Sequence, residues 1–234
     1  RSLRYARPLF ISLSGRDGGK LREALHAEYC ATGDLDIVSD CPLPMFMTPD
    51  AFTALLGGNG LSGEALEEQS AAFIKLQTAM SEALGAGRHT LRIMLRLSRL
   101  KQVLDEGQCQ APGYLFMQDD SITMNAAACA ASLTGLVDYL NRFPDSLHLH
   151  LTNNIEPFCG DCCWHMKRDR HVCIASFARG MSNVLYTDEP ALVREDSARY
   201  HALWLSNSKV IHSRERTIFT LTEAIRLLHE RYLN

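Results

Sequence analysis

The sequence lacks long hydrophobic runs: no apolar segment approaches the roughly 20 residues that a membrane-spanning helix needs, so we expect no membrane partner. It also lacks an excess of charge, with 24 basic and 27 acidic side chains. That balance argues against broad electrostatic affinity for nucleic acid. Low-complexity segments and repeats are absent too. The 234 residues, 46% of them apolar, fit a globular protein, which we interpret as a single α/β domain over 1–234.

Cysteine is present at a density well below that of a disulfide-stabilised scaffold, and the chain opens at Arg1 without an apolar leader. We therefore expect a reducing, cytoplasmic compartment. Half of the cysteines lie within residues 159–173. The eight are Cys30, Cys41, Cys109, Cys129, Cys159, Cys162, Cys163 and Cys173.

Hydrophobic periodicity predicts alternating strands and helices, and hence a mixed sheet flanked by helices. Leu91, Ile93 and Leu95 alternate with polar residues, as in a half-buried strand. Thr48 and Ser62 are predicted to cap the helices that follow them. Strands are predicted at 8–13, 35–38, 89–96, 147–151 and 184–186, hairpins at 114–124 and 163–175, and helices at 20–29, 49–57, 62–84, 133–140, 190–204 and 222–233.

The densest group of reactive side chains is Cys159, Cys162, Cys163, His171 and Cys173. Thiolates and imidazoles suit Zn²⁺. Cys159 and Cys162 have the spacing of a zinc knuckle, whereas His171 and Cys173 are too close together in the sequence for that motif. The same cysteines could form a redox-active disulfide, or simply be buried structural residues. Zinc is accordingly the one cofactor that the sequence suggests.

Two further pairs of side chains share a strand face. Arg92 and Arg96 could hold an anionic ligand or a phosphate backbone, or could line a solvated sheet edge. His148 and His150 could bind a metal or point into solvent. All these alternatives stay open at this point.

The segment His165-Met166-Lys167 resembles the His-x-Lys motif of phospholipase D-like enzymes, in which the His is a nucleophile or acid and the Lys binds phosphate. Where that family has an Asp, five positions after the Lys, this chain has Val172, and the predicted first hairpin contains no His-x-Lys. A complete catalytic set therefore cannot be assembled. We predict no catalytic residues, and take His165, Lys167, Arg92 and Arg96 as candidate ligand-binding residues.

The layout as a whole resembles the C-terminal sensing region of Xre-type bacterial transcription regulators, whose effector domains look like degenerate phospholipase D folds. The pieces that carry the resemblance are 45–52, 62–84, 91–95 and 183–204. The resemblance implies a layered α/β architecture that binds an effector or dimerises. We find no helix-turn-helix here, so a DNA-binding domain, if the protein has one, is expected before Arg1.

We therefore predict a non-enzymatic domain that senses a small molecule, a metal or redox state for a bacterial transcription regulator. We also expect it to form a homodimer. The alternatives are a phosphodiesterase or nuclease that uses His165 and Lys167, and a zinc-stabilised interaction domain.

Overall fold

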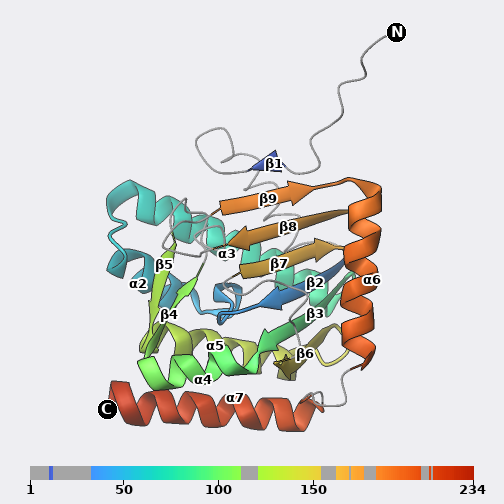
Figure 1. Cartoon of the computed structure of the whole chain (residues 1–234). Helices are drawn as coiled ribbons and strands as arrows, with labels where there is room; N and C mark the ends of the chain where they lie inside the picture. The colour runs from blue at the N-terminus through green and yellow to red at the C-terminus, as the bar shows by residue number, and fades with distance from the viewer. Residues whose placement is uncertain are drawn as a thin grey trace.

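The computed structural model describes residues 11–12, 33–111, 121–153, 162–168, 170–176, 183–206, 211 and 213–234. Its centre is a seven-stranded mixed sheet with the order β1-β9-β8-β7-β2-β3-β6 (Figure 1). β2, β3 and β6 are parallel to one another, whereas β1, β9, β8 and β7 each run antiparallel to the next strand in that order. The strands are β1 (Ile11–Ser12), β2 (Gly33–Ser39), β3 (His89–Arg96), β6 (Leu147–Thr152), β7 (Cys162–Lys167), β8 (His171–Ser176) and β9 (Asn183–Thr187).

A second, two-stranded sheet pairs β4 (Gln108–Ala111) with β5 (Ile122–Asn125). The helices are α2 (Pro49–Gly58), α3 (Gly63–Gly85), α4 (Leu97–Glu106), α5 (Ala126–Arg142), α6 (Pro190–Ser206) and α7 (Arg214–Leu228), with a 3₁₀ turn η2 (Pro44–Phe46) and a π-helical turn η5 (His229–Leu233). The predicted α/β class with a mixed sheet and flanking helices is confirmed. Among the described helices, none is long and apolar enough to cross a membrane.

The two faces of the central sheet carry different side chains. On one face, alternate residues of β2, β3 and β6, such as Leu35, Leu91 and Leu149, are buried in the main core together with residues of α2, α3, α5 and α7. On the other face, Val38, Met94 and Met166 form a small cluster with Val193 and Tyr200 of α6. Polar residues occupy much of this second face, and the candidate site is built on it.

The structure contains one of the two helix caps that the sequence predicts. The side chain of Thr48 accepts a hydrogen bond from the Ala51 amide at the start of α2, as predicted, and Pro49 is the first helical residue. Ser62 precedes α3 but makes no capping hydrogen bond through its side chain, so that detail of the prediction is wrong. Asn125 and Ser213 cap α5 and α7 through their side chains.

Helix α5 contacts the η2 turn unusually closely at Gly135. A β-carbon built on Gly135 would lie 1.6 Å from the carbonyl oxygen of Phe46 and 2.6 Å from its carbonyl carbon. One turn earlier in α5, the hydroxyl of Ser132 donates to the carbonyl of Leu43 at 2.7 Å. Only glycine permits this approach, so Gly135 fixes the position of η2 on α5.

Most predicted elements match the structure, and the differences are local. The predicted strand at 35–38, the helix at 62–84 and the hairpin at 163–175 correspond to β2, α3 and the β7–β8 pair. Helix α4 was not predicted, and α7 begins at Arg214 rather than near 222. In place of the predicted hairpin at 114–124, β5 pairs with β4 among the described residues. The predicted first strand of that hairpin, 114–117, and the predicted helix 20–29 lie outside the described residues.

Candidate functional site

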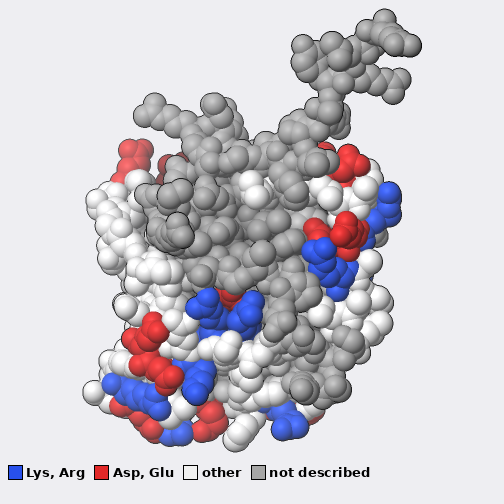
Figure 2. All heavy atoms as spheres, in the orientation of Figure 1, with Lys and Arg blue, Asp and Glu red and all other residues white. Residues whose placement is uncertain are grey.

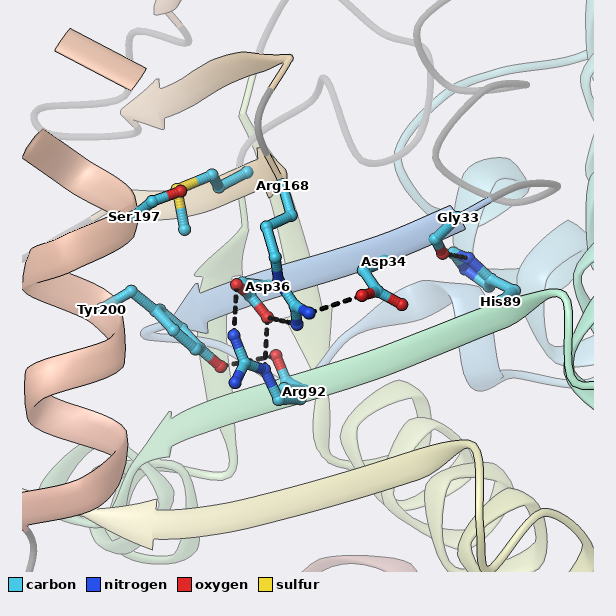
Figure 3. Close-up of polar contacts among 9 residues, drawn as sticks. Gly33, Asp34, Asp36, His89, Arg92, Arg168, Ser197 and Tyr200 are labelled. Carbon is cyan, nitrogen blue, oxygen red and sulfur yellow. Dashed lines mark hydrogen bonds and ion pairs between the residues drawn. The ribbon is translucent and has the colours of Figure 1, made fainter. Parts of the chain in front are cut away.

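Acidic and basic side chains from three strand segments form a charged ladder on the α6 face of the sheet (Figure 3). Asp36 of β2 stands opposite Arg92 of β3 in the strand register. Nε and Nη2 of Arg92 donate to the two carboxylate oxygens of Asp36, both at 2.7 Å. Arg168, which follows β7, donates to Asp34 at 2.5 Å and to Asp36 at 3.3 Å. Asp36 is therefore shared by two guanidinium groups, and its side chain is only 1% exposed.

Helix α6 closes over one end of this ladder. The hydroxyl of Tyr200 donates to the backbone carbonyl of Arg92 at 2.7 Å. The guanidinium carbon of Arg92 lies 5.2 Å from the ring centre of Tyr200 and 5.5 Å from that of Trp204. Trp204 in turn stacks on His150 of β6, with ring centres 3.6 Å apart. Arg92 thus has a carboxylate on one side and two aromatic rings on the other.

Burial, and then the negative charge of Asp36, raise the pKa of Tyr200 well above its ordinary value. Because the folded pKa exceeds that of the unfolded chain, the free energy of unfolding should fall as the pH rises above about 10. We expect Tyr200→Phe to cost about 1 kcal/mol at neutral pH through the lost hydrogen bond, and to make this alkaline fall shallower. Urea unfolding of both proteins across that pH range checks this; parallel pH profiles would contradict it.

A pocket of about 410 Å³ opens beside this ladder, at the edge strand β6. Its basic and aromatic lining comes from both sides of the strand: Arg92, His148, His150 and Trp204 from the ladder side, and Arg214 from the start of α7. The described residues that line it are Arg92, Leu140, Pro144, Leu147, His148, Leu149, His150, Trp204, Arg214 and Thr217. These residues include two arginines and two histidines but no acidic side chain, so the pocket favours an anion.

The two arginines of the pocket differ in their surroundings. Burial acts to lower the pKa of Arg92, but the hydrogen bonds and the charge of Asp36 outweigh it and raise that pKa. Like any arginine, Arg92 is charged. Asp36 offsets part of that charge. Arg214 forms no ion pair within the described part of the chain. Of the two arginines, Arg214 is therefore the one whose charge no carboxylate of the described residues offsets.

A second pocket, of about 350 Å³, lies between η2, α3 and α5. Its lining mixes charges of both signs, with Glu82 and Asp138 beside Arg142, and includes the Ser81–Tyr139 hydrogen bond of 2.6 Å. This mixture gives no preference for the charge of a ligand.

The predicted ligand-binding residues do not gather in one place. Arg92 lines the β6-edge pocket, whereas Arg96 pairs with Asp40 at 2.5 Å and lines neither pocket. Because β3 lies between β2 and β6, the interpretation of the arginines as a solvated sheet edge is wrong. Lys167 is buried next to Gly33 and also lines neither pocket. His165 belongs to β7, but its side chain lies outside the described part.

The predicted metal ligands remain untested. Cys162, Cys163, His171 and Cys173 have described backbones in β7 and β8, and Cys159 lies outside the described residues. The register places His165 opposite Cys173 and Lys167 opposite His171. Within the described ranges, no group of three or more His, Cys, Asp or Glu side chains could hold a metal ion.

Sequence reasoning missed the acidic half of the ladder. Asp36 on β2 and Asp40, the residue after β2, have the same spacing as Arg92 and Arg96 on β3, and this match was the available signal. His148 and His150 were recognised as sharing a strand face, but not as pocket residues. The described surface visible in Figure 2 shows acidic and basic side chains interspersed.

Comparisons with known proteins assign no family. No family model and no curated protein matches the chain. Among solved structures, an archaeal chromatin protein, TrmBL2, described as showing a novel mode of DNA binding, aligns with a TM-score of 0.40 and 11% sequence identity. The alignment covers 87% of this chain and 54% of that chain, so this chain spans about half of its length. A similarity at this level supports no conclusion about function.

Proposed function

We propose that this chain is a non-enzymatic regulatory domain that binds a small anionic effector in the β6-edge pocket. The observation that carries the proposal is the pocket itself: Arg92, Arg214 and two histidines converge on one hollow, and none of the described residues that line it is acidic. Its volume of about 410 Å³ lies within the usual range for small-molecule sites. The bacterial transcription regulators that the sequence resembles would use such a domain to sense an effector.

The lining also indicates the class of ligand. Leu140, Pro144 and Leu147 supply apolar surface beside the cations, which suits a molecule with a charged head and an apolar or aromatic body. Carboxylate and phosphate groups match the fork of donors on Arg214. We therefore propose an organic carboxylate or phosphate as the effector.

A route from the pocket to the rest of the domain runs through Arg92. This side chain lines the pocket and at the same time holds Asp36, which also binds Arg168 beyond β7. An anion that draws Arg92 toward the pocket would weaken its bond to Asp36. Such a ligand binds two arrangements of the ladder with different affinity, which is what a sensing domain requires.

The pairing of the carboxylates favours recognition over catalysis. Asp36 is buried and accepts from both Arg92 and Arg168, and Asp34 accepts from Arg168, so both carboxylates are ion-paired in the way that holds a structure together. The proposal includes a phospholipase D-like layered architecture, a cytoplasmic homodimer, and DNA contact only through a separate domain. Zinc at the cysteine cluster remains a prediction beside it.

Titration calorimetry with phenyl phosphate and benzoate, with phenol as the uncharged comparison, tests the proposal. We expect one site for the anions, and Arg214→Gln should weaken their binding by roughly 10- to 100-fold through loss of a charge-assisted hydrogen bond. Arg216→Gln is the matched control, because Arg216 lies on the same helix, is exposed and does not line the pocket. Absence of anion binding, or equal losses in both variants, would refute the proposal.

A further inference from the structure

Two cysteines outside the predicted metal cluster lie in direct contact. The sulfur atoms of Cys109 on β4 and Cys129 on α5 are 3.8 Å apart. Both are free thiols in this structure; Cys129 is fully buried and Cys109 is partly exposed. A disulfide bond would require the two sulfurs to approach by about 1.8 Å, which is within reach of small side-chain rotations.

The elements that carry the pair are held firmly. Cys109 stands opposite Met124 in the β4–β5 register, and the Cys129 thiol donates weakly to the Met124 carbonyl at 3.6 Å. Asn125 both ends β5 and caps α5, so Cys129 lies one turn into the helix. The side chain of Asn59 bonds both the amide and the carbonyl of Thr123, which fastens the ribbon to the end of α2. Contact between the sulfurs is therefore built into the fold.

We propose that Cys109 and Cys129 form an oxidisable dithiol that a peroxide converts to an intramolecular disulfide in the folded protein. The partly exposed Cys109 reacts first: its sulfur bonds to one peroxide oxygen, the O–O bond breaks, and water and a sulfenic acid result. The Cys129 sulfur then attacks the Cys109 sulfur, and the S–O bond breaks with loss of a second water. Two thiols are oxidised and the peroxide is reduced by two electrons.

Oxidation should be slow at neutral pH and accelerate in alkali. The contact with Cys129, followed by burial, raises the pKa of Cys109 well above its ordinary value. Because the thiolate is the nucleophile, the rate should rise roughly tenfold per pH unit below that pKa. This behaviour distinguishes the pair from low-pKa sensor thiols, which react fast at neutral pH.

The cysteine pair and the proposed effector pocket share no residue. The pair ties the β4–β5 ribbon to the first turns of α5 through Cys129, whereas the pocket lies at β6 and touches α5 near its end, at Leu140. The bond would close a loop across 20 residue positions, which restricts the unfolded chain. We expect the melting temperature of the oxidised protein to rise by roughly 6–12 °C.

The test treats the folded full chain with hydrogen peroxide at increasing pH, quenches it with an alkylating agent and maps the peptides by mass spectrometry without reduction. We expect a cross-linked peptide pair containing Cys109 and Cys129, two hydrogens lighter than the reduced pair. Cys109→Ala and Cys129→Ser should abolish it; serine can still donate to the Met124 carbonyl. The control Cys41→Ala, which removes a buried thiol elsewhere, should keep the cross-link. If both thiols stay alkylatable, or link only after denaturation, the proposal is wrong.

Discussion

Replacing Asp36 with alanine should lower the free energy of unfolding by roughly 3 kcal/mol. The variant leaves Arg92 in a mostly buried place, where its side chain is 15% exposed, without its bidentate carboxylate. Arg168 keeps Asp34, so the expected loss lies at the lower end of the range for breaking a buried ion pair. Urea unfolding measures the change as a shift in midpoint at constant slope.

The matched comparison is a surface ion pair of the same chemistry. Glu223→Ala removes a carboxylate 2.9 Å from Arg226, where both side chains are more than 40% exposed. Solvent already screens that pair, so we expect a loss below about 1 kcal/mol. Similar losses in the two variants would mean that burial of the ladder does not determine its contribution.

Gly135→Ala is expected to destabilise the protein by about 3 kcal/mol or more, although alanine is ordinarily the better helix former. The new methyl group would collide with the backbone oxygen of Phe46, which cannot rotate away as a flexible side chain would. To relieve this collision, η2 must move away from α5, and that movement would break the hydrogen bond from Ser132 to the carbonyl of Leu43. Thermal and urea unfolding report the loss.

Gly58→Ala provides the control for helix propensity. Gly58 ends α2, and a β-carbon there would meet nothing within 4 Å. We expect this variant to be neutral or more stable by less than about 1 kcal/mol. A stable Gly135→Ala protein would show that η2 and α5 can separate at little cost.

Helices and strands could be predicted where the residues of the element itself carry the pattern. Alternation of Leu91, Ile93 and Leu95 indicated β3, and Thr48-Pro49 indicated the start of α2. Helix α4 was missed because it follows β3 directly and its N-cap, Arg96, makes no side-chain capping bond. The start of α7 was missed because its buried stripe begins at Thr217, a polar residue.

The site could not be predicted in the same way because it depends on pairing between distant segments. Asp36 and Arg92 meet only because β2 and β3 are parallel and in that register. The pocket collects residues from 92 to 217 around one edge strand. The sequence singled out Arg92, and separately His148 and His150, but nothing in their local spacing indicated that Trp204 and Arg214 would join them.

Strand β2 is where the parallel half of the sheet meets its antiparallel half. Asp36 binds an arginine from each half, Arg92 on one side and Arg168 on the other. Sliding either neighbour along β2 by one residue would turn its side chains to the opposite face and break an ion pair. One carboxylate therefore holds β2 in register with two neighbours, one 56 and the other 132 positions away along the chain, and opposes a shear of the sheet at this junction.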